Sequence, residues 1–428
     1  MKNLYRDVIV WDGECDAARR CDVQVDDGII TAVSPRGTFE YGSAYEGHGK
    51  TALIPGFVNA HGHAAMTLLR GLGEDLPLMD WLTKRIWPIE NKLNGDLVYT
   101  GTQQAILEML STGTTCFTDM YFFMDRTADA ALDAGIRAAL CRGLMGDGEK
   151  FKQSLYENLK LAEDYNGARG LITVQLGPHA PYTVSVDDMK VIAAVAKEKN
   201  LAVQLHWLET KTEWSISEGS KHYDLPEELL SDTGLIDVKH LILAHCVWID
   251  KERMPFYARP NVTAVHNPKS NIKLGSGFAP VAKMREDGVN VAIGTDGAAS
   301  NNRLDMWEEL RFAALVQKGL YSDPTVLPAE EVLRMATVYG AKALGFDNIG
   351  LIKEGYAADF MLIDLDKPHY NGWTLENLAG CLVYAGSSAD VKTTVVAGET
   401  LYHMGTFPKL DAEKIMKDAA EARRFLTA

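Results

Sequence analysis

Apolar strand-like segments alternate with longer helical stretches from about residue 54 to about residue 345, and this pattern constrains the fold more than any other feature of the chain. Such alternation is typical of a parallel α/β architecture. After a first strand within 54–64, strands are predicted at 114–118, 138–142, 171–176, 202–206, 241–245, 262–266 and 289–294. Eight strand–helix pairs predict a (β/α)8 TIM barrel, which places its chemistry at the carboxyl ends of the strands.

The two ends of the chain predict short strands instead. Segments 7–11, 21–25 and 29–33 read as strands, and an Asp-Asp-Gly turn at 26–28 joins the last two. Strands are predicted again at 359–364, 381–384, 391–396 and 400–402, before an amphipathic helix over 411–428. Each end is too small for a core of its own. We therefore predict that residues 1–55 and 350–428 form one small β-sandwich domain beside a barrel of residues 56–349.

The composition argues against several kinds of partner. The chain has 428 residues and a net charge of −15, which disfavours nucleic acid and anionic membranes. No segment has the length and apolarity of a membrane span, and the first residues do not lead into a signal-peptide core. The six cysteines are scattered without a Cys-x-x-Cys pair, so neither a disulfide framework nor a thiolate zinc site is suggested. We expect a cytoplasmic protein.

The first barrel strand ends in His61-Gly62-His63. Residues i and i+2 of a strand point to the same side, so both imidazoles project together from one strand end. Two neutral imidazoles on one side can chelate a divalent transition metal. Such pairs also occur on protein surfaces, so these two histidines alone leave the function open.

Four further polar residues fall at the same end of other predicted strands. His206 ends the fifth strand and is followed by Glu209, His245 ends the sixth strand, and Asp296 follows the eighth. Each of them alone could be a buried histidine, a helix cap or a solvated charge. Together with the first pair they indicate a nitrogen and oxygen site for zinc or a similar metal at the barrel mouth, with room for a water molecule.

Five motifs lie at or beside these strand ends. They are Pro-Gly-Phe-Val-Asn-Ala-His-Gly-His at 55–63, Leu-His-Trp-Leu-Glu at 205–209, Ala-His-Cys at 244–246, His-Asn-Pro-Lys-Ser-Asn at 266–271 and Gly-Thr-Asp-Gly-Ala-Ala-Ser-Asn at 294–301. The motifs resemble those of the amidohydrolase superfamily, closest to its 5'-methylthioadenosine/S-adenosylhomocysteine deaminases, over essentially the whole chain. The resemblance implies a distorted (β/α)8 barrel, one catalytic metal and hydrolytic removal of an amino group from an adenine ring.

On this resemblance, His61, His63, His206 and Asp296 bind one divalent metal per chain. Zinc is expected, with iron(II) and manganese(II) as alternatives. No lysine stands at a strand end between His63 and His206, where a carboxylated bridge to a second metal would be expected. We therefore predict a mononuclear site.

Three residues are expected to move protons and orient the water. A divalent metal lowers the pKa of a water molecule that it binds. Asp296 would accept a proton from this water, and His245 would orient it through a hydrogen bond. Glu209 would protonate the ring nitrogen and carry a proton to the leaving ammonia, which is general acid–base catalysis.

Four residues are expected to contact the substrate. The segment 80–90 resembles the ribose-binding loop of the family, in which Trp81 would pack on the ligand and Glu90 would accept hydrogen bonds from the ribose hydroxyls. His179, after the fourth strand, would contact the purine or the ribose, and Arg142, at the end of the third, would lie near the substrate. The alternatives are a core residue for Trp81, a solvated charge for Glu90 and a structural salt bridge for Arg142.

The loop after the third strand departs from the family pattern. Relatives that accept S-adenosylhomocysteine carry an arginine in this loop, but residues 143–154 contain none. Lys150 or Lys152 could substitute, although a lysine lacks the bidentate fork of arginine. The preferred 5'-substituent therefore stays open among S-adenosylhomocysteine, methylthioadenosine, adenosine and 5'-deoxyadenosine.

Two other functions compete with deamination of a nucleoside. The first is hydrolysis of another aminated heterocycle, such as a guanine, a pterin or a triazine, and Glu90 together with Trp81 argues against it. The second is a non-catalytic metal-binding barrel, which would not need Glu209 and His245. The expected partner is thus a small nucleoside, with no nucleic acid or membrane partner, and a homo-oligomer is left open.

Overall fold

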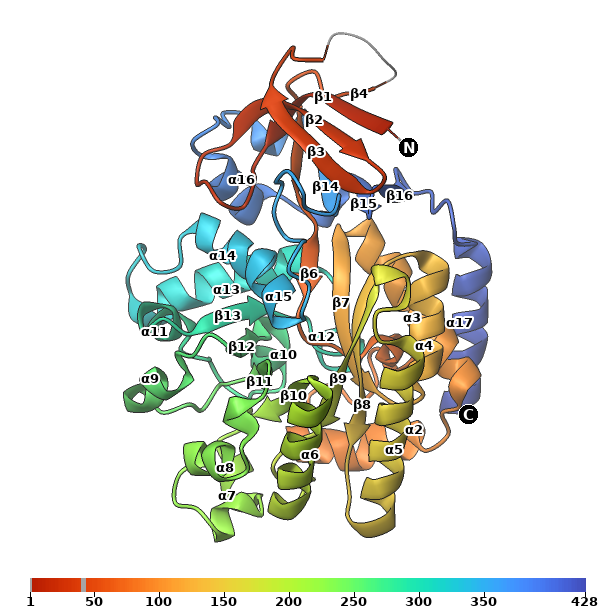
Figure 1. The fold of residues 1–428 in the computed structure, drawn as a ribbon, viewed down its shortest axis with the longest axis vertical. Helices are drawn as coiled ribbons and strands as arrows, with labels where there is room; N and C mark the ends of the chain where they lie inside the picture. The colour runs from red at the N-terminus through yellow and green to blue at the C-terminus, as the bar shows by residue number, and fades with distance from the viewer. Residues whose placement is uncertain (1, 40–43) are drawn as a thin grey trace.

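The barrel consists of eight parallel strands that neighbour one another in chain order, from β6 to β13 (Figure 1). The computed structural model describes residues 2–39 and 44–428. The barrel strands are β6 (Phe57–Asn59), β7 (Thr114–Tyr121), β8 (Arg137–Leu144), β9 (Ile172–Pro178), β10 (Ala202–Trp207), β11 (Leu241–His245), β12 (Val262–His266) and β13 (Asn290–Ile293). The N–H of Ala60 donates to the carbonyl of Ile293 over 3.0 Å, which brings the first and last strands together. The predicted (β/α)8 barrel is confirmed.

Helices of unequal length surround the barrel. The long barrel helices follow β6 to β9 and β13, whereas β10 to β12 are followed only by short helices, which distorts the regular pattern. The helices are α1 (Leu78–Trp81), α2 (Trp87–Glu90), α3 (Gly95–Ser111), α4 (Met124–Ala134), α5 (Gly148–Tyr165), α6 (Val186–Lys199), α7 (Glu213–Ile216), α8 (Pro226–Asp232), α9 (Met254–Tyr257), α10 (Pro268–Lys273), α11 (Val281–Glu286), α12 (Ala298–Asn301), α13 (Met306–Tyr321), α14 (Ala329–Met335), α15 (Val338–Ala343), α16 (Leu378–Ala385) and α17 (Ala412–Thr427). Within residues 2–39 and 44–428, no helix is both long and apolar enough to cross a membrane.

Both ends of the chain build one mixed sheet, as predicted. Its order is β16-β15-β14-β5-β1-β2-β3, with β4 beside β1. The strands are β1 (Lys2–Val10), β2 (Arg19–Asp26), β3 (Ile29–Pro35), β4 (Tyr45–Glu46), β5 (Thr51–Pro55), β14 (Phe360–Asp364), β15 (Val391–Val396) and β16 (Glu399–His403). The antiparallel pairing of β14 with β5 joins the two chain ends. Because β5 runs directly into β6, the sheet lies at the amino-terminal end of the barrel, away from the carboxyl ends of the strands (Figure 1).

The segment 381–384, predicted as a strand, instead belongs to helix α16. The buried residues of this helix are Leu378, Ala379, Leu382 and Val383. They form two adjacent pairs four residues apart, which places them on one face of a helix. A short apolar run does not distinguish a strand from a buried helix by periodicity alone. The prediction was wrong because the window of four residues was too short to show the helical period.

The last helix packs on the barrel and not on the sheet that precedes it. In α17 the buried residues are Ile415, Ala419, Ala422 and Leu426, whose spacing of three to four residues confirms the predicted amphipathic helix. Figure 1 shows α17 alongside α3, with which it is in contact. The carboxyl end of the chain therefore ties the sheet domain to the barrel.

A buried ion pair also joins the two domains. Arg137, at the start of β8, donates from Nε to Asp359 over 2.6 Å and from Nη2 over 3.0 Å, and Asp359 lies just before β14. Asp359 additionally accepts the N–H of Ala397 over 2.8 Å. The Arg137 and Asp359 side chains are only 7% and 1% exposed, so each charge depends on its partner in place of water.

Replacing Asp359 with Asn is expected to lower the free energy of unfolding by about 3–5 kcal/mol, because the guanidinium of Arg137 is left buried without a counter-charge. Urea denaturation followed by circular dichroism measures this loss. The control is Asp366→Asn, which breaks an exposed pair with Lys50 and should cost less than about 1 kcal/mol. Equal losses in the two variants would mean that the buried pair does not hold the domains together.

Candidate active site

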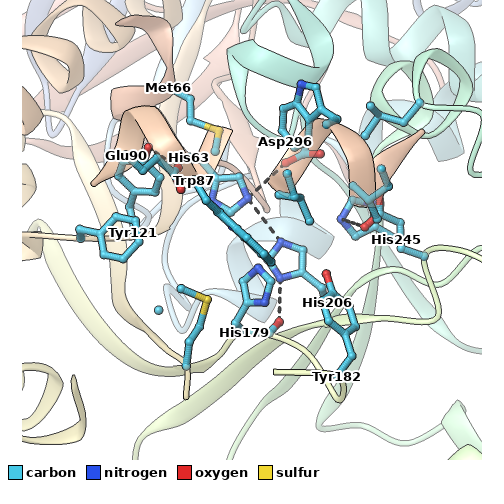
Figure 2. Close-up of a pocket in the computed structure, with 18 residues that line it drawn as sticks. His63, Met66, Trp87, Glu90, Tyr121, His179, Tyr182, His206, His245 and Asp296 are labelled. Carbon is cyan, nitrogen blue, oxygen red and sulfur yellow. Dashed lines mark hydrogen bonds and ion pairs between the residues drawn. The ribbon is translucent and has the colours of Figure 1, made fainter. Parts of the chain in front are cut away.

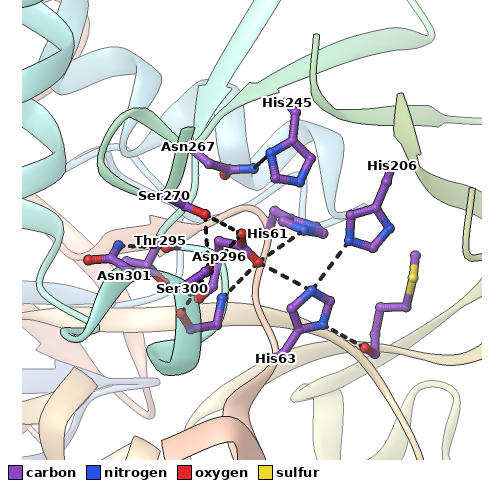
Figure 3. A network of polar contacts seen from close by, with 12 residues as sticks. His61, His63, His206, His245, Asn267, Ser270, Thr295, Asp296, Ser300 and Asn301 are labelled. Carbon is purple, nitrogen blue, oxygen red and sulfur yellow. Dashed lines mark hydrogen bonds and ion pairs between the residues drawn. The ribbon is translucent and has the colours of Figure 1, made fainter. Parts of the chain in front are cut away.

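Three histidines present one ring nitrogen each to the same point at the barrel mouth (Figure 3). Nδ1 of His63 donates to the carbonyl of Met120 over 2.8 Å, and Nδ1 of His206 donates to the carbonyl of His179 over 2.7 Å. Nδ1 of His61 faces Oε1 of Gln204 at 3.1 Å. Because carbonyl oxygens only accept hydrogen bonds, these contacts place the proton on Nδ1 and leave a lone pair on each Nε2.

Nε2 of His61 and Nε2 of His63 face one carboxylate oxygen of Asp296, and Nε2 of His206 lies beside that of His63. Nε2 of His63 lies 3.4 Å from Nε2 of His206 and 3.3 Å from Oδ1 of Asp296, and Nε2 of His61 lies 3.7 Å from the same oxygen. Among the described residues, Nε2 of His61 has no hydrogen-bond partner although it is buried. Lone pairs and a carboxylate that face one another at these distances repel unless a cation lies between them. The donor set, three nitrogens and one oxygen, fits a divalent metal such as zinc.

The pKa values of these groups agree with a cation site. Burial lowers the pKa of His61 to about 3, so its imidazole is neutral and able to bind a metal at pH 7. Burial also lowers the pKa of His206 well below its usual value. Burial disfavours charge on His63 as well, but the hydrogen bond and charge of Asp296 outweigh it and raise the pKa of His63 to about 9. Asp296 therefore stabilises positive charge at this point: a proton on Nε2 of His63 supplies that charge when no cation is bound, and a bound metal would displace this proton and use the lone pair.

Asp296 is oriented by the loop that follows β13. It has a positive φ of 60°, and its Oδ2 accepts hydrogen bonds from Ser270 over 2.6 Å and from Ser300 over 3.0 Å. These bonds leave Oδ1 directed at the histidines (Figure 3). Gly294 lets this segment approach β6, since a Cβ there would lie 2.8 Å from the backbone nitrogen of His61.

His245 and Glu209 lie on the other side of the same cluster. Nδ1 of His245 donates to Oδ1 of Asn271 over 2.8 Å, which leaves its buried Nε2 unpartnered among the described residues. This Nε2 is 3.8 Å from Oε2 of Glu209. With His61 and Asp296, His245 also forms a second set with metal-ligand spacing, so its position suits either a ligand or a group that orients water. Burial raises the pKa of Glu209, which favours a carboxyl that carries a proton.

A pocket with largely apolar walls opens above this cluster (Figure 2). The carboxyl of Glu209 and the rings of His63, His206 and His245 line its polar part. The apolar walls are Met66, Leu78, Trp81, Leu82, Trp87, Phe122, Met145 and Leu274. A planar, partly apolar ligand with a few polar atoms matches this distribution.

Three of the four residues predicted to contact the substrate line the pocket. Trp81 lies on α1 and is buried in its wall, and Glu90 lies at the end of α2, where its Oε1 accepts a 2.6 Å hydrogen bond from the hydroxyl of Tyr121. His179 follows β9, and its ring centroid is 4.7 Å from that of His206. Burial lowers the pKa of His179 to about 3, which keeps the imidazole neutral. Whether these residues bind substrate stays a prediction.

Arg142 is not among the residues that line the pocket. Its Nε donates to Glu157 over 2.7 Å, one Nη donates to the carbonyl of Gly143 over 2.6 Å, and the guanidinium stacks on Phe122 at 4.7 Å. This is the structural salt bridge named above as the alternative. A direct contact of Arg142 with substrate therefore remains a prediction that these contacts do not support.

Other residues of the site had not been predicted from the sequence. Tyr121 holds Glu90, Tyr182 and Trp87 line the pocket, and Glu213 bonds the backbone beside Glu209. Tyr121 ends β7, so the rule that polar residues at strand ends form the site would have identified it. Glu213 begins the short helix α7 and is not at a strand end, so no such signal marks it.

The fold and the site define a hydrolase of the α/β barrel class with a histidine and carboxylate centre. Residues 52–401 match the sequence profile of the Amidohydrolase family, and the chain belongs to this family. It is therefore a hydrolytic enzyme.

Individual relatives are similar over nearly the whole chain. The chain is 44% identical to a 5-methylthioadenosine/S-adenosylhomocysteine deaminase of Dictyoglomus thermophilum over 400 aligned residues. The alignment covers 93% of this chain and 92% of that protein. It is 42% identical over 416 residues to a 5'-deoxyadenosine deaminase of Methanothermobacter thermautotrophicus, covering 96% and 95%. The crystal structure of an adenosine deaminase from Xanthomonas campestris with bound zinc superimposes with a TM-score of 0.93 and 34% identity, over 99% of this chain and 98% of that one.

Proposed function

We propose that this protein hydrolytically deaminates the adenine ring of adenosine-type nucleosides, releasing ammonia and the inosine-type product. One observation carries the proposal: a half-buried carboxylate suited to sugar hydroxyls, Glu90, lines the same pocket as Glu209 and the histidine cluster. The deaminases of nucleosides among the relatives support it.

We propose that His61, His63, His206 and Asp296 hold one divalent ion, with zinc as the best fit to this donor set and iron(II) or manganese(II) as alternatives. When bound, such an ion supplies the Lewis acidity that lowers the pKa of a water molecule. The pocket wall around the cluster keeps other water away from the reacting atoms, which strengthens each electrostatic contact.

Side chains of the protein transfer the protons and orient the water. Oδ1 of Asp296 accepts a proton from the attacking water, and the unpartnered Nε2 of His245 orients this water. As the water oxygen bonds to C6, Glu209 gives its proton to ring nitrogen N1. Glu209, now a carboxylate, takes the proton of the hydroxyl formed at C6 and passes it to the amino group, so that the C6–N bond breaks, ammonia leaves and a C6 carbonyl remains. The proton held by Asp296 is then passed to Glu209, which restores both residues. Burial raises the pKa of Glu209, which favours the protonated carboxyl that the first of these transfers needs.

Glu90 would recognise the ribose. Its carboxylate is held by Tyr121 on one oxygen, which leaves the other free to accept hydrogen bonds from the 2'- and 3'-hydroxyls. Trp81 would cover the sugar or the base from the wall of the pocket. The free base adenine makes none of the hydroxyl contacts.

In Glu90→Ala, kcat/KM for adenosine is expected to fall roughly ten- to a hundredfold, because hydrogen bonds to a charged group contribute about 1.5–3 kcal/mol. Adenine should be a poor substrate of both proteins and little changed by the substitution. Tyr121→Phe is the matched control, since it removes the hydroxyl that holds Glu90 but leaves the carboxylate, and it should lose less. Equal losses on adenine and adenosine in Glu90→Ala would exclude Glu90 as a ribose ligand.

The part of the pocket beyond Glu90 is mostly apolar, with Asn91 and Thr183 as its uncharged polar residues. Trp87, Leu93, Phe122, Phe123 and Met145 line this outer chamber, and Glu90 is the one charged residue among its described lining. A 5'-substituent on a ribose held by Glu90 would enter this chamber. An apolar methylthio group suits such walls, whereas the charged amino-acid end of S-adenosylhomocysteine would need a counter-charge.

Lys150 and Lys152, predicted in a loop, lie in the first turns of helix α5 and outside the outer chamber. Lys150 lines an adjoining surface hollow, and Nζ of Lys152 pairs with Glu149 over 2.8 Å at the surface. Methylthioadenosine, adenosine or 5'-deoxyadenosine should therefore match or exceed S-adenosylhomocysteine in kcat/KM.

The proposed function is tested by measuring ammonia release from adenosine, 5'-deoxyadenosine, methylthioadenosine, S-adenosylhomocysteine, guanine and a pterin. If activity is highest on guanine or the pterin, the substrate is another aminated heterocycle and not an adenosine-type nucleoside. A strong preference for S-adenosylhomocysteine that disappears in Lys150→Ala or Lys152→Ala would show that a lysine binds its carboxylate. No activity in a metal-loaded protein would refute deamination of these compounds.

We propose a small nucleoside as the main partner and a cytoplasmic location. The net charge of −15 disfavours nucleic acid and anionic membranes as partners. The six cysteines are free in the structure, in keeping with a reducing compartment. Sedimentation velocity would establish whether the protein forms a homo-oligomer.

A further inference from the structure

His206 and Glu209 reach the same pocket although they are three residues apart after one strand. In an unbroken strand, residues with this spacing point to opposite faces of the sheet. β10 ends at Trp207, and Leu208 has a φ of 50°, in the left-handed region that a leucine rarely adopts. This turn, which we call the Leu208 turn, brings the Glu209 carboxyl to within 3.8 Å of Nε2 of His245.

The carboxylate of Glu213 bonds directly to the Leu208 turn. Its Oε1 accepts the backbone N–H of Leu208 over 2.8 Å, and its Oε2 accepts the backbone N–H of Glu209 over 2.7 Å. Glu213 is 1% exposed and is not among the residues that line the pocket. It therefore acts on the backbone and has no contact with a substrate.

The opposite side of the turn is fixed by the loop after β11. The carbonyl of Leu208 accepts the N–H of Trp248 over 2.9 Å, and the carbonyl of Trp207 accepts the N–H of Cys246 over 2.9 Å. These bonds hold the carbonyls, whereas Glu213 holds the two N–H groups. Without Glu213, two buried donors beside the catalytic carboxyl would be unsatisfied, and the strained backbone at Leu208 would relax.

We infer that Glu213 is a positioning residue, which fixes the Leu208 turn and thereby aims the carboxyl of Glu209 at the substrate and His245. The inference rests on the proposed function, because Glu213 acts through the proton transfer assigned to Glu209. Both carboxylate oxygens are needed, since each accepts a different N–H. A carboxamide of the same shape has one acceptor oxygen and would place an NH2 group against the second N–H.

The test is Glu213→Gln, assayed on methylthioadenosine or whichever nucleoside the wild-type protein deaminates best. Per bound metal ion, kcat is expected to fall about ten- to a hundredfold, with KM within about twofold of wild type because the pocket walls are unchanged. Glu218→Gln is the matched control: Glu218 lies just after α7, the helix that Glu213 begins, and accepts one N–H, from Val186 over 3.2 Å, but does not touch the Leu208 turn. It should keep the wild-type kcat.

A double-mutant cycle separates positioning from general stabilisation. If Glu213 acts through Glu209, adding Glu213→Gln to Glu209→Gln should cause little further loss of kcat. Additive losses, or a wild-type kcat in Glu213→Gln, would overturn the inference. If Glu213→Gln does not fold, Glu213→Asp, which keeps the charge on a shorter side chain, takes its place in the cycle. A wild-type protein without deaminase activity would refute the proposed function instead, so the two failures are distinguishable.

Discussion

Replacement of His206 with Ala is expected to abolish deamination and to reduce the metal content from one ion per chain to near zero. In the proposed site His206 supplies one of four donor atoms, and its Nε2 lies 3.4 Å from that of His63, so its loss leaves the donor set incomplete. His61→Ala should behave in the same way, because that imidazole is fully buried beside Asp296.

Metal analysis by mass spectrometry, together with the rate of ammonia release, measures both effects. Removing the metal from the wild-type protein with a chelator should also abolish activity, and added zinc should restore it. His403→Ala is the control, since His403 lies in β16 of the sheet domain, bonded to Thr393. Two tightly bound ions per active chain, or full activity in metal-free His206→Ala, would rule out the mononuclear site.

Glu209→Gln is expected to keep its metal and to lose roughly 10²–10⁴-fold in kcat, the range typical of removing a general acid–base group. The carboxamide of glutamine has the same shape as the carboxyl of Glu209. Glu209 is outside both sets of residues with metal-ligand spacing, so the substitution should leave the residues that bind the metal unchanged. The amide cannot give a proton to the ring nitrogen or pass one to the leaving ammonia.

The pH dependence gives a second measurement of the same residue. Glu209 must be protonated to act as the acid, and a carboxyl is protonated below its pKa. Because burial raises this pKa, the wild-type activity should extend to higher pH than an exposed glutamate would allow, and then decline as the pH rises through it. The small residual activity of Glu209→Gln should lack this decline. A near-normal rate in Glu209→Gln would remove Glu209 from the mechanism.

Patterns of a few residues were enough to predict the architecture of the barrel. All eight predicted strands are present, because strands of a parallel barrel are buried on both faces and read as apolar runs. The polar residues His61, His206 and Asp296 lie together because every strand of such a barrel ends at the same face. The strand-end residues alone predicted only a metal site. The resemblance of the motifs to a family then made the prediction more specific, namely a nucleoside deaminase.

The directions of long side chains could not be predicted from the sequence. Arg142 turns to Glu157, fifteen residues away on α5, and a strand end alone does not say whether a long side chain points into the pocket or out of it. The helix α16 replaced a predicted strand for a different reason: four apolar residues are too few to show the helical period that Leu378, Leu382 and their neighbours have. The direction of Arg142 depends on a contact that no local window contains.

The periodicity of the chain thus determined which residues end the strands, since alternation and apolar runs are local properties of the backbone. Only the tertiary structure decided how these residues meet. The Glu209 carboxyl enters the pocket because a strained turn at Leu208 breaks the alternation of β10, and that turn persists because Glu213 and the loop after β11 satisfy its backbone groups. This backbone conformation is unfavourable for a leucine in isolation. The hydrogen-bond partners that the fold brings to the turn must therefore offset its conformational free energy.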